Sequence, residues 1–271
     1  MPLNDKILVK DKNDIILKVE DLSISRSGQV IIKDVNLDIS KGEFVGIAGP
    51  NGSGKTTLLL AILGILKPMN GRIQIFNQKP MSRRVFGRIG WVSQAASNLP
   101  TNIKITVKEL VKLGTLNNRN MIFRDRKSNL EKIEKAINIV GLQDEVNTDI
   151  SRLSGGQRQR AVIARCLASD AEFILFDEPL VGIDRDSKNK LLKLLDDLCH
   201  DEKKTILIVS HDISAIRQTV HRMIYFDEKV RYDGNPDQLP ELDVLASLRG
   251  IKPVHDSISQ KLVIRKPLEG E

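Results

Sequence analysis

The sequence is poor in cysteine and in aromatic residues. Cys166 and Cys199 are the two cysteines among 271 residues, which excludes a disulfide framework and a cysteine-rich metal site. Two such residues are typical of reduced thiols in a cytosolic protein. Phenylalanine, tryptophan and tyrosine make up 4% of the chain, so we expect a core built mainly from aliphatic side chains.

Long hydrophobic stretches are also missing. The longest apolar run, residues 58–66, is interrupted by Gly64 and is far shorter than the ~20 residues that span a bilayer. The start of the chain is rich in lysine and lacks the apolar stretch of a signal peptide. We therefore expect a protein that is soluble in the cytoplasm or is held at a membrane through a partner.

Basic residues outnumber acidic ones. Lysine and arginine total 42 and aspartate and glutamate total 35, which leaves a formal charge of +7 at pH 7. This balance excludes an acidic disordered protein. It is typical of proteins that bind nucleic acid, lie at a membrane surface or handle anions, and the charge alone does not separate these classes.

Three short apolar runs are typical of strands that are buried on both faces, as in a parallel sheet. They span residues 44–48, 173–176 and 205–209, and each is followed by a loop and a helical pattern. This order predicts an α/β domain with a mainly parallel sheet and helices on both of its faces.

The other segments predict how this domain is divided. Residues 15–25 and 29–39 alternate with period two on either side of a short turn, which predicts an N-terminal antiparallel β subdomain. A charged helical stretch predicts a helical subdomain at about residues 95–170, inserted into the α/β core. An Asn-Pro turn then predicts that the domain covers residues 15–235 and that residues 236–271 form a tail or small appendage.

A glycine-rich motif follows the first apolar run. It matches the pattern G-x-x-x-x-G-K-[ST] and precedes a predicted helix at residues 57–66. In such a loop, backbone N–H groups and a helix N-terminus face one anion, while the lysine binds phosphate and the last hydroxyl binds Mg²⁺. The sequence therefore predicts a phosphate-binding P-loop formed by Gly49, Pro50, Asn51, Gly52, Ser53, Gly54, Lys55 and Thr56.

Polar residues follow the other apolar runs, at what should be the same sheet edge. Asp177 and Glu178 come directly after the second run, and His211 comes shortly after the third. Ligands of such sheets bind beyond the carboxyl ends of the strands, so Asp177 is suited to Mg²⁺ and Glu178 to accepting a proton from water. Gln94 also follows an apolar stretch, and neither His211 nor Gln94 proves a function by itself.

A second helix N-terminus is suited to binding an anion. A serine can cap the helix that follows, and two glycines allow a ligand to approach the backbone closely. A monomer with one P-loop has no obvious need for this second anion site. The motif consists of Leu153, Ser154, Gly155, Gly156 and Gln157.

Taken with the P-loop and the Asp177-Glu178 pair, this Leu-Ser-Gly-Gly-Gln signature resembles the ATP-binding cassette (ABC) ATPase family. The motifs stand in the family's order over roughly residues 17–234. The resemblance implies a P-loop NTPase core. It also implies that two copies pack head to tail around two ATP molecules, each held between the P-loop of one copy and the signature of the other.

The resemblance also implies catalytic roles. Glu178 would be the general base, His211 would contact the γ-phosphate, and Gln94 would be the third catalytic residue, acting at Mg²⁺. Asp184 matches the family's loop that signals across the dimer.

The cofactors implied are ATP and Mg²⁺. Thr57 would join the P-loop in binding ATP. The family commonly stacks adenine on an aromatic residue near position 26, where this chain has Arg26, and a guanidinium can also stack on a base. Mg²⁺ would be bound, in part through water, by Thr56, Gln94 and Asp177.

Within the family, the chain resembles the ATP-binding subunits of zinc/manganese-type metal importers, notably in residues 177–184 and 209–213. It would then be peripheral on the cytoplasmic face of the cell membrane, with a membrane permease as direct partner and a solute-binding protein as indirect partner. The helical subdomain and residues 95–106 would dock the permease. The four histidines have no ligand-like spacing, so no transition-metal site is predicted in this chain.

Two other hypotheses stay open at this point. A soluble ABC ATPase could act in scaffold assembly, on nucleic acid or on the ribosome, and the basic charge is compatible with that role. The chain lacks the coiled-coil insertion of DNA-repair relatives and the second cassette of translation-associated relatives, so no nucleic-acid partner is predicted. A nucleotide-binding module without hydrolysis is not favoured, because Glu178 and His211 are both present.

Overall fold

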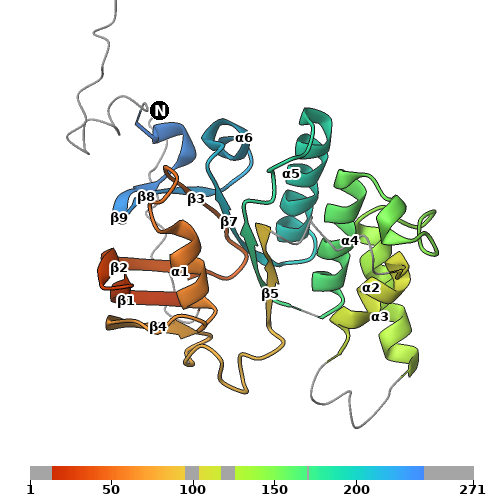
Figure 1. Cartoon of the computed structure of the whole chain (residues 1–271), viewed down its shortest axis with the longest axis horizontal. Helices are drawn as coiled ribbons and strands as arrows, with labels where there is room; N and C mark the ends of the chain where they lie inside the picture. Colours follow the sequence, from red (N-terminus) through yellow and green to blue (C-terminus); the bar gives the residue numbers. More distant parts are fainter. Residues whose placement is uncertain (1–13, 95–103, 117–125, 170, 241–271) are drawn as a thin grey trace, which may run out of the picture. The chain divides into compact units, whose positions relative to one another are not determined.

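The computed structural model describes residues 14–94, 104–116, 126–169 and 171–240 (Figure 1). The chain divides into two compact units, Met1–Asp237 and Gln238–Glu271, and the elements named below lie in the first. Most of the predicted tail lies outside the described residues. So do residues 95–103, which are most of the segment 95–106 that we expect to dock the permease.

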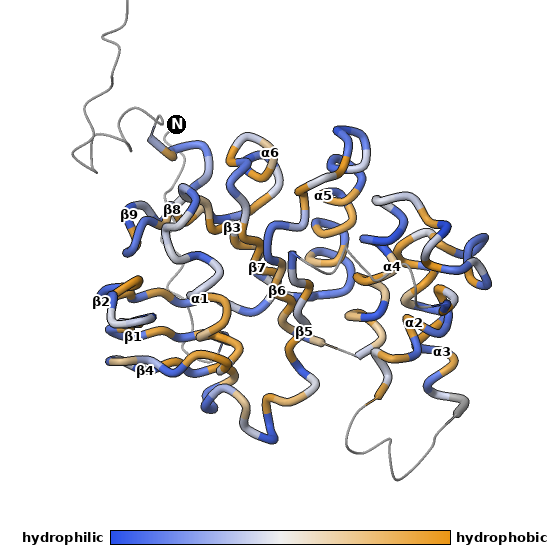
Figure 2. Tube along the Cα trace, in the orientation of Figure 1, coloured by the Kyte–Doolittle hydropathy of each residue, from blue (hydrophilic) through white to orange (hydrophobic). Residues whose placement is uncertain are grey.

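A six-stranded sheet forms the centre of the first unit. Its strands are β3 (Phe44–Ala48), β5 (Ile89–Val92), β6 (Phe173–Asp177), β7 (Thr205–Ser210), β8 (Arg222–Asp227) and β9 (Lys229–Gly234). The order is β5-β6-β7-β3-β8-β9, and all neighbours are parallel except β8 and β9. Every residue of β3, β6 and β7 is buried, as expected for strands covered on both faces, and Figure 2 shows these strands as mainly hydrophobic.

A second, antiparallel sheet contains β1 (Ile15–Arg26), β2 (Gln29–Ser40) and β4 (Asn70–Ile75) in the order β2-β1-β4. Arg26 pairs with Gln29, so Ser27 and Gly28 form a two-residue turn. Both turn residues have positive φ, as the tight turns of twisted hairpins require. The predicted antiparallel β subdomain is therefore confirmed.

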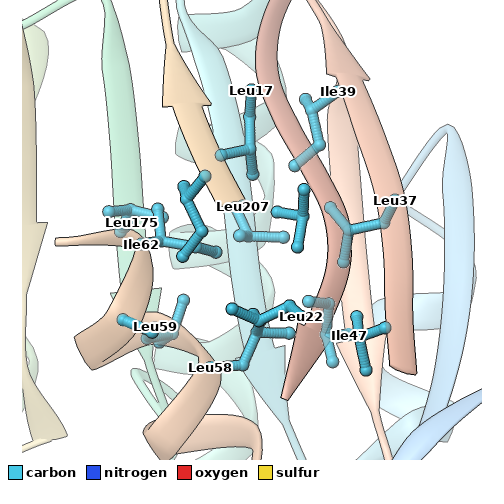
Figure 3. Close-up of a cluster of buried hydrophobic side chains, with 14 of the residues drawn as sticks. Leu17, Leu22, Leu37, Ile39, Ile47, Leu58, Leu59, Ile62, Leu175 and Leu207 are labelled. Atoms are coloured by element: carbon cyan, nitrogen blue, oxygen red, sulfur yellow. The ribbon is translucent and has the colours of Figure 1, made fainter. Parts of the chain in front are cut away.

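One aliphatic core joins the two sheets through helix α1 (Lys55–Ile62) (Figure 3). Burial of this apolar surface is the main force that holds α1 against the strands. Because α1 directly follows the P-loop, the core also fixes the position of that loop. The core side chains include Leu17, Leu22, Leu37 and Ile39 from the antiparallel sheet, Leu58, Leu59 and Ile62 from α1, and Ile47, Leu175 and Leu207 from the central sheet.

Helices α2 (Val107–Gly114), α3 (Arg126–Ile139) and α4 (Gly155–Leu167) pack against one another, and α4 also contacts β5 (Figure 1). The approach of α2 to α4 depends on Gly114, where a Cβ would lie 1.8 Å from the carbonyl oxygen of Arg165. Helix α5 (Arg185–His200) packs on β7, and the short α6 (Ile213–Arg217) packs on β3.

The elements differ from the sequence predictions in two ways. The helix predicted at residues 57–66 is α1, which begins at Lys55 and ends at Ile62, because Gly64 adopts a left-handed φ of 76° just beyond it. Strands β4, β5, β8 and β9 were not predicted, and β5, with four residues, is too short to show a clear period. The predicted α/β class with a mainly parallel sheet is confirmed.

Candidate functional site

The P-loop connects the carboxyl end of β3 to the first turn of α1. Gly52 and Gly54 have φ values of 79° and 97°, a backbone conformation that a side chain would strain. Gly49 lies against β8, where a Cβ would come within 2.0 Å of the carbonyl oxygen of Phe226. The path of the loop therefore requires glycine at these three positions.

Lys55 is buried at the start of α1, and its ammonium lies against its own loop. Nζ donates to the carbonyl oxygens of Gly49 at 2.9 Å and Pro50 at 2.8 Å. Phosphate oxygens accept stronger, charge-assisted hydrogen bonds than carbonyl oxygens do. The ammonium is therefore placed to exchange these carbonyls for the phosphates of a bound nucleotide.

Thr56 and Asp177 bring two oxygen ligands together beside the P-loop. The Thr56 hydroxyl donates to Asp177 Oδ1 at 3.2 Å. Asp177 ends β6 and is buried, and this burial raises the pKa of its carboxyl although the hydrogen bond from Thr56 opposes the shift. Hydroxyl and carboxylate oxygens are the ligands that Mg²⁺ prefers, so this pair fits the predicted Mg²⁺.

Glu178 and His211 meet where β6 and β7 end. Asp177 pairs with Val209 in the strand register, so the residues that follow the two strands are neighbours. Oε2 of Glu178 lies 2.8 Å from His211 Nδ1 and also accepts from the His211 backbone N–H at 3.3 Å. Glu178 has a φ of 50°, which is uncommon without glycine and recurs at functional sites.

A cavity of about 470 Å³ joins these groups. The structure therefore brings together most of the predicted ATP-binding residues with Gln94, Glu178 and His211. Ile31 and Val181 also line the cavity, and neither of these two apolar residues was predicted from the sequence as a site residue. The lining consists of Arg26, Ile31, Asn51, Gly52, Ser53, Gly54, Lys55, Thr56, Thr57, Gln94, Glu178, Val181 and His211.

The signature lies elsewhere, at the N-terminus of α4. Ser154 Oγ accepts from the Gln157 N–H at 3.2 Å, and Gln157 Oε1 accepts from the Ser154 N–H at 2.9 Å, which forms a capping box. Ser154 and Gln157 border a separate cavity of about 360 Å³, together with residues of the α5 N-terminus. Within the described chain, the signature therefore does not line the P-loop cavity.

Asp184 is the N-cap of α5, and its neighbours Ile183 and Ser187 line this second cavity. Its Oδ1 accepts from the Ser187 N–H at 2.9 Å, which caps the helix. Hydrogen bonds from Ser187, first from the side chain and then from the backbone, lower the pKa of Asp184. Its neighbour Ile183 lines the cavity beside Ser154, so Asp184 and the signature lie close together.

Three potential metal ligands meet away from the P-loop. His200 Nδ1 lies 3.1 Å, and His221 Nε2 3.9 Å, from Asp196 Oδ1. However, the Phe44 N–H donates to His221 Nδ1 at 3.2 Å, which leaves the proton of the neutral ring on Nε2. A metal-bound histidine normally donates from its second nitrogen, so the surroundings of His221 do not suit a metal ligand.

The fold and the cavity define a P-loop nucleotide-binding protein. The family model described as ABC transporter matches residues 32–181, more than half of the sequence, and the chain therefore belongs to the ABC transporter family. No helix among the described residues is both long and apolar enough to cross a membrane.

Known proteins similar to this chain are ATP-binding subunits. It is 33% identical over 240 residues to the zinc uptake system ATP-binding protein ZurA of Listeria monocytogenes, covering 86% of this chain and 93% of that protein. It is 31% identical over 211 residues to the manganese transport system ATP-binding protein MntB of Bacillus subtilis, and the match covers 78% of this chain and 80% of that protein.

A solved structure is similar over the same region. The dimeric ATP-binding cassette MJ0796, in a post-hydrolysis state bound to ADP and Pi, is 30% identical with a TM-score of 0.67, covering 82% of this chain and 99% of that one. The chain is thus an ATPase and the ATP-binding subunit of an ABC transporter. None of these relatives supports the alternative of a soluble ATPase in assembly or nucleic-acid work.

Proposed function

We propose that this ATPase drives the import of a divalent transition-metal ion of the zinc or manganese type through a membrane permease. The observation that carries the proposal is the 33% identity to a zinc uptake subunit over 86% of the chain. The manganese relative supports the same class of cargo without deciding between the two ions.

The P-loop binds the phosphates of ATP. The N–H groups at the start of α1 and the Lys55 ammonium would bind the β- and γ-phosphates, and Arg26 and Ile31, which line the same cavity, would lie beside the ribose and base. Thr56 and Asp177, which contact each other, would hold Mg²⁺ together with Gln94, which lines the same cavity as Thr56. When bound, Mg²⁺ neutralises charge on the phosphate oxygens.

Glu178 acts as the general base. It accepts a proton from the water that attacks the γ-phosphate, while the bond to the leaving ADP oxygen breaks. The side chain of His211 is 51% exposed, and its Nδ1 contacts Oε2 of Glu178. This position lets the imidazole orient the base and reach the γ-phosphate.

A second copy of the chain completes the site. The P-loop cavity of the described chain lacks signature residues, whereas Ser154 and Gln157 border a separate cavity. In a head-to-tail homodimer the signature of the partner copy covers the nucleotide, and Asp184 connects the two sites. The dimeric structure of the MJ0796 cassette supports this arrangement.

The permease docks on an apolar groove between the β4–β5 connection and α2. The groove has a volume of about 250 Å³. Met81, Phe86 and Leu116 line it with 68%, 59% and 61% of their surface exposed, an unusual gathering of apolar side chains for a soluble surface. A cytoplasmic loop of the permease would cover them and hold the ATPase at the membrane, while a solute-binding protein would deliver the ion from the other side.

An affinity pull-down from detergent-solubilised membranes tests the transporter assignment. We expect the tagged chain to recover a polytopic membrane protein in stoichiometric amount, as identified by mass spectrometry. Exclusive recovery of soluble proteins would contradict it. Uptake of radioactive zinc and manganese then tests the cargo: cells that lack the chain should lose uptake of one ion, and wild-type chain but not Glu178→Gln should restore it.

A further inference from the structure

A partly buried ion pair joins the start of α5 to the segment that carries His211. The ammonium of Lys188, in the first turns of α5, lies 3.0 Å from Asp212 Oδ2. The two side chains are 29% and 28% exposed, whereas Lys135 of the surface pair Lys135–Glu202 is 63% exposed. Exposed pairs contribute little, and reduced exposure to solvent strengthens the attraction of this pair.

Asp212 is fixed on three sides. Its Oδ1 accepts from the Ser214 hydroxyl at 2.9 Å and from the Ala215 N–H at 3.2 Å, which caps α6. Its own N–H donates to Ser210 Oγ at 3.1 Å. Burial alone would raise the pKa of the Asp212 carboxyl. The hydrogen bonds from Lys188, Ser214 and Ala215 outweigh this effect and lower its pKa below the usual value.

His211 lies directly between these fixed points and Glu178. It precedes Asp212 in the chain, and its imidazole and backbone N–H both contact Glu178 Oε2. At the other end of the pair, the Lys188 N–H donates to the Asp184 carbonyl oxygen at 2.9 Å, within the turn that begins α5. A continuous set of contacts therefore runs from Asp184 through Lys188 and Asp212 to His211.

We propose that Lys188 is a positioning residue that places His211 for hydrolysis by holding Asp212 against the α5 N-terminus. This inference rests on the role that the proposed function gives to His211. Lys188 does not line the P-loop cavity and contacts no reacting group. It acts through the backbone of the 210–212 segment, so the position of His211 follows that of Asp184.

The test is ATP hydrolysis by Lys188→Met. We expect kcat to fall about fivefold or more with KM for ATP within about twofold, since only the transition-state contact of His211 is disturbed. Lys188→Arg should restore at least half of the wild-type kcat, because a guanidinium can reach the same carboxylate. Lys193→Met, an exposed lysine of the same helix, is the matched control and should match wild type. A Lys188→Met variant with the kcat of Lys193→Met would overturn the proposal.

Combination with His211→Ala separates positioning from a structural effect. If Lys188 acts through His211, Lys188→Met should cause no further loss in a His211→Ala background under single-turnover conditions. An equal further loss would show that Lys188 acts by another route and would overturn the proposal. Wild-type hydrolysis by His211→Ala alone would instead overturn the role of His211 in the proposed function.

Asp212→Asn provides a second variant if Lys188→Met fails to fold. Asparagine keeps an oxygen to cap α6 but removes the charge that faces Lys188. We expect the same loss of kcat at unchanged KM, with a melting temperature close to that of wild type. Hydrolysis at the wild-type rate by this folded variant would overturn the proposal as well.

Discussion

Oε2 of Glu178 lies 2.8 Å from Nδ1 of His211, so the carboxylate and the imidazole that are expected near the γ-phosphate contact each other. The Lys55 ammonium is likewise bound to carbonyl oxygens of its own loop. Nucleotide binding must therefore exchange existing contacts rather than order free side chains. Such pre-positioning reduces the entropic cost of binding ATP.

Glu178→Gln should bind ATP and dimerise but hydrolyse about 10²–10⁴-fold more slowly, because the amide cannot accept the proton of the attacking water. Phosphate release measures the rate, and fluorescence of Trp91, the single tryptophan, measures binding near Gln94. Glu131→Gln, an exposed glutamate of α3, is the control and should hydrolyse normally. Hydrolysis by Glu178→Gln at the parent rate would mean that another group is the base.

Lys55→Ala should weaken ATP binding by roughly 10–100-fold, the magnitude expected when one charge-assisted hydrogen bond is lost. Isothermal titration calorimetry measures the change. Lys67→Ala, an exposed lysine just beyond α1, controls for the general loss of one positive charge. Tight ATP binding by Lys55→Ala would contradict the assignment of the P-loop.

Much of this site could be predicted from sequence, because backbone geometry and strand register dictate it. Gly49 and Gly54 are required by the path of the loop, and the parallel register of β6 and β7 brings Glu178 to His211. The ion pair of Lys188 with Asp212 could not be predicted, since it depends on how α5 lies over the sheet. Asp212 lies in the 209–213 stretch, but Lys188 lies outside every motif of the sequence.

Asp177→Asn should stabilise the fold while it abolishes hydrolysis. Burial raises the pKa of Asp177, so its carboxyl binds a proton more readily in the folded state than in the unfolded chain. Above the folded pKa the carboxylate is charged in both states, and its charge lowers the free energy of unfolding. At neutral pH we therefore expect the melting temperature of Asp177→Asn to lie above that of wild type.

The pH dependence of this difference is the sharper measurement. As the pH falls through the raised folded pKa toward the unfolded value of 3.8, wild-type Asp177 becomes protonated and the advantage of asparagine should disappear. Melting curves from pH 7 to 4 test this, with the exposed Asp144→Asn as a control that should show no such trend. A lower melting temperature for Asp177→Asn throughout would contradict the argument.

The cluster of Asp196, His200 and His221 should not bind Zn²⁺ through His221. A metal on His221 Nε2 would require Nδ1 to carry a proton toward the Phe44 N–H, which places two donors face to face. Zinc titrations of the wild-type chain and of His221→Ala, followed by calorimetry at neutral pH, should therefore give the same isotherm. A saturable site that is lost in both His200→Ala and His221→Ala would show that the Phe44 hydrogen bond yields to the metal. The chain would then bind the kind of ion that its proposed transporter moves.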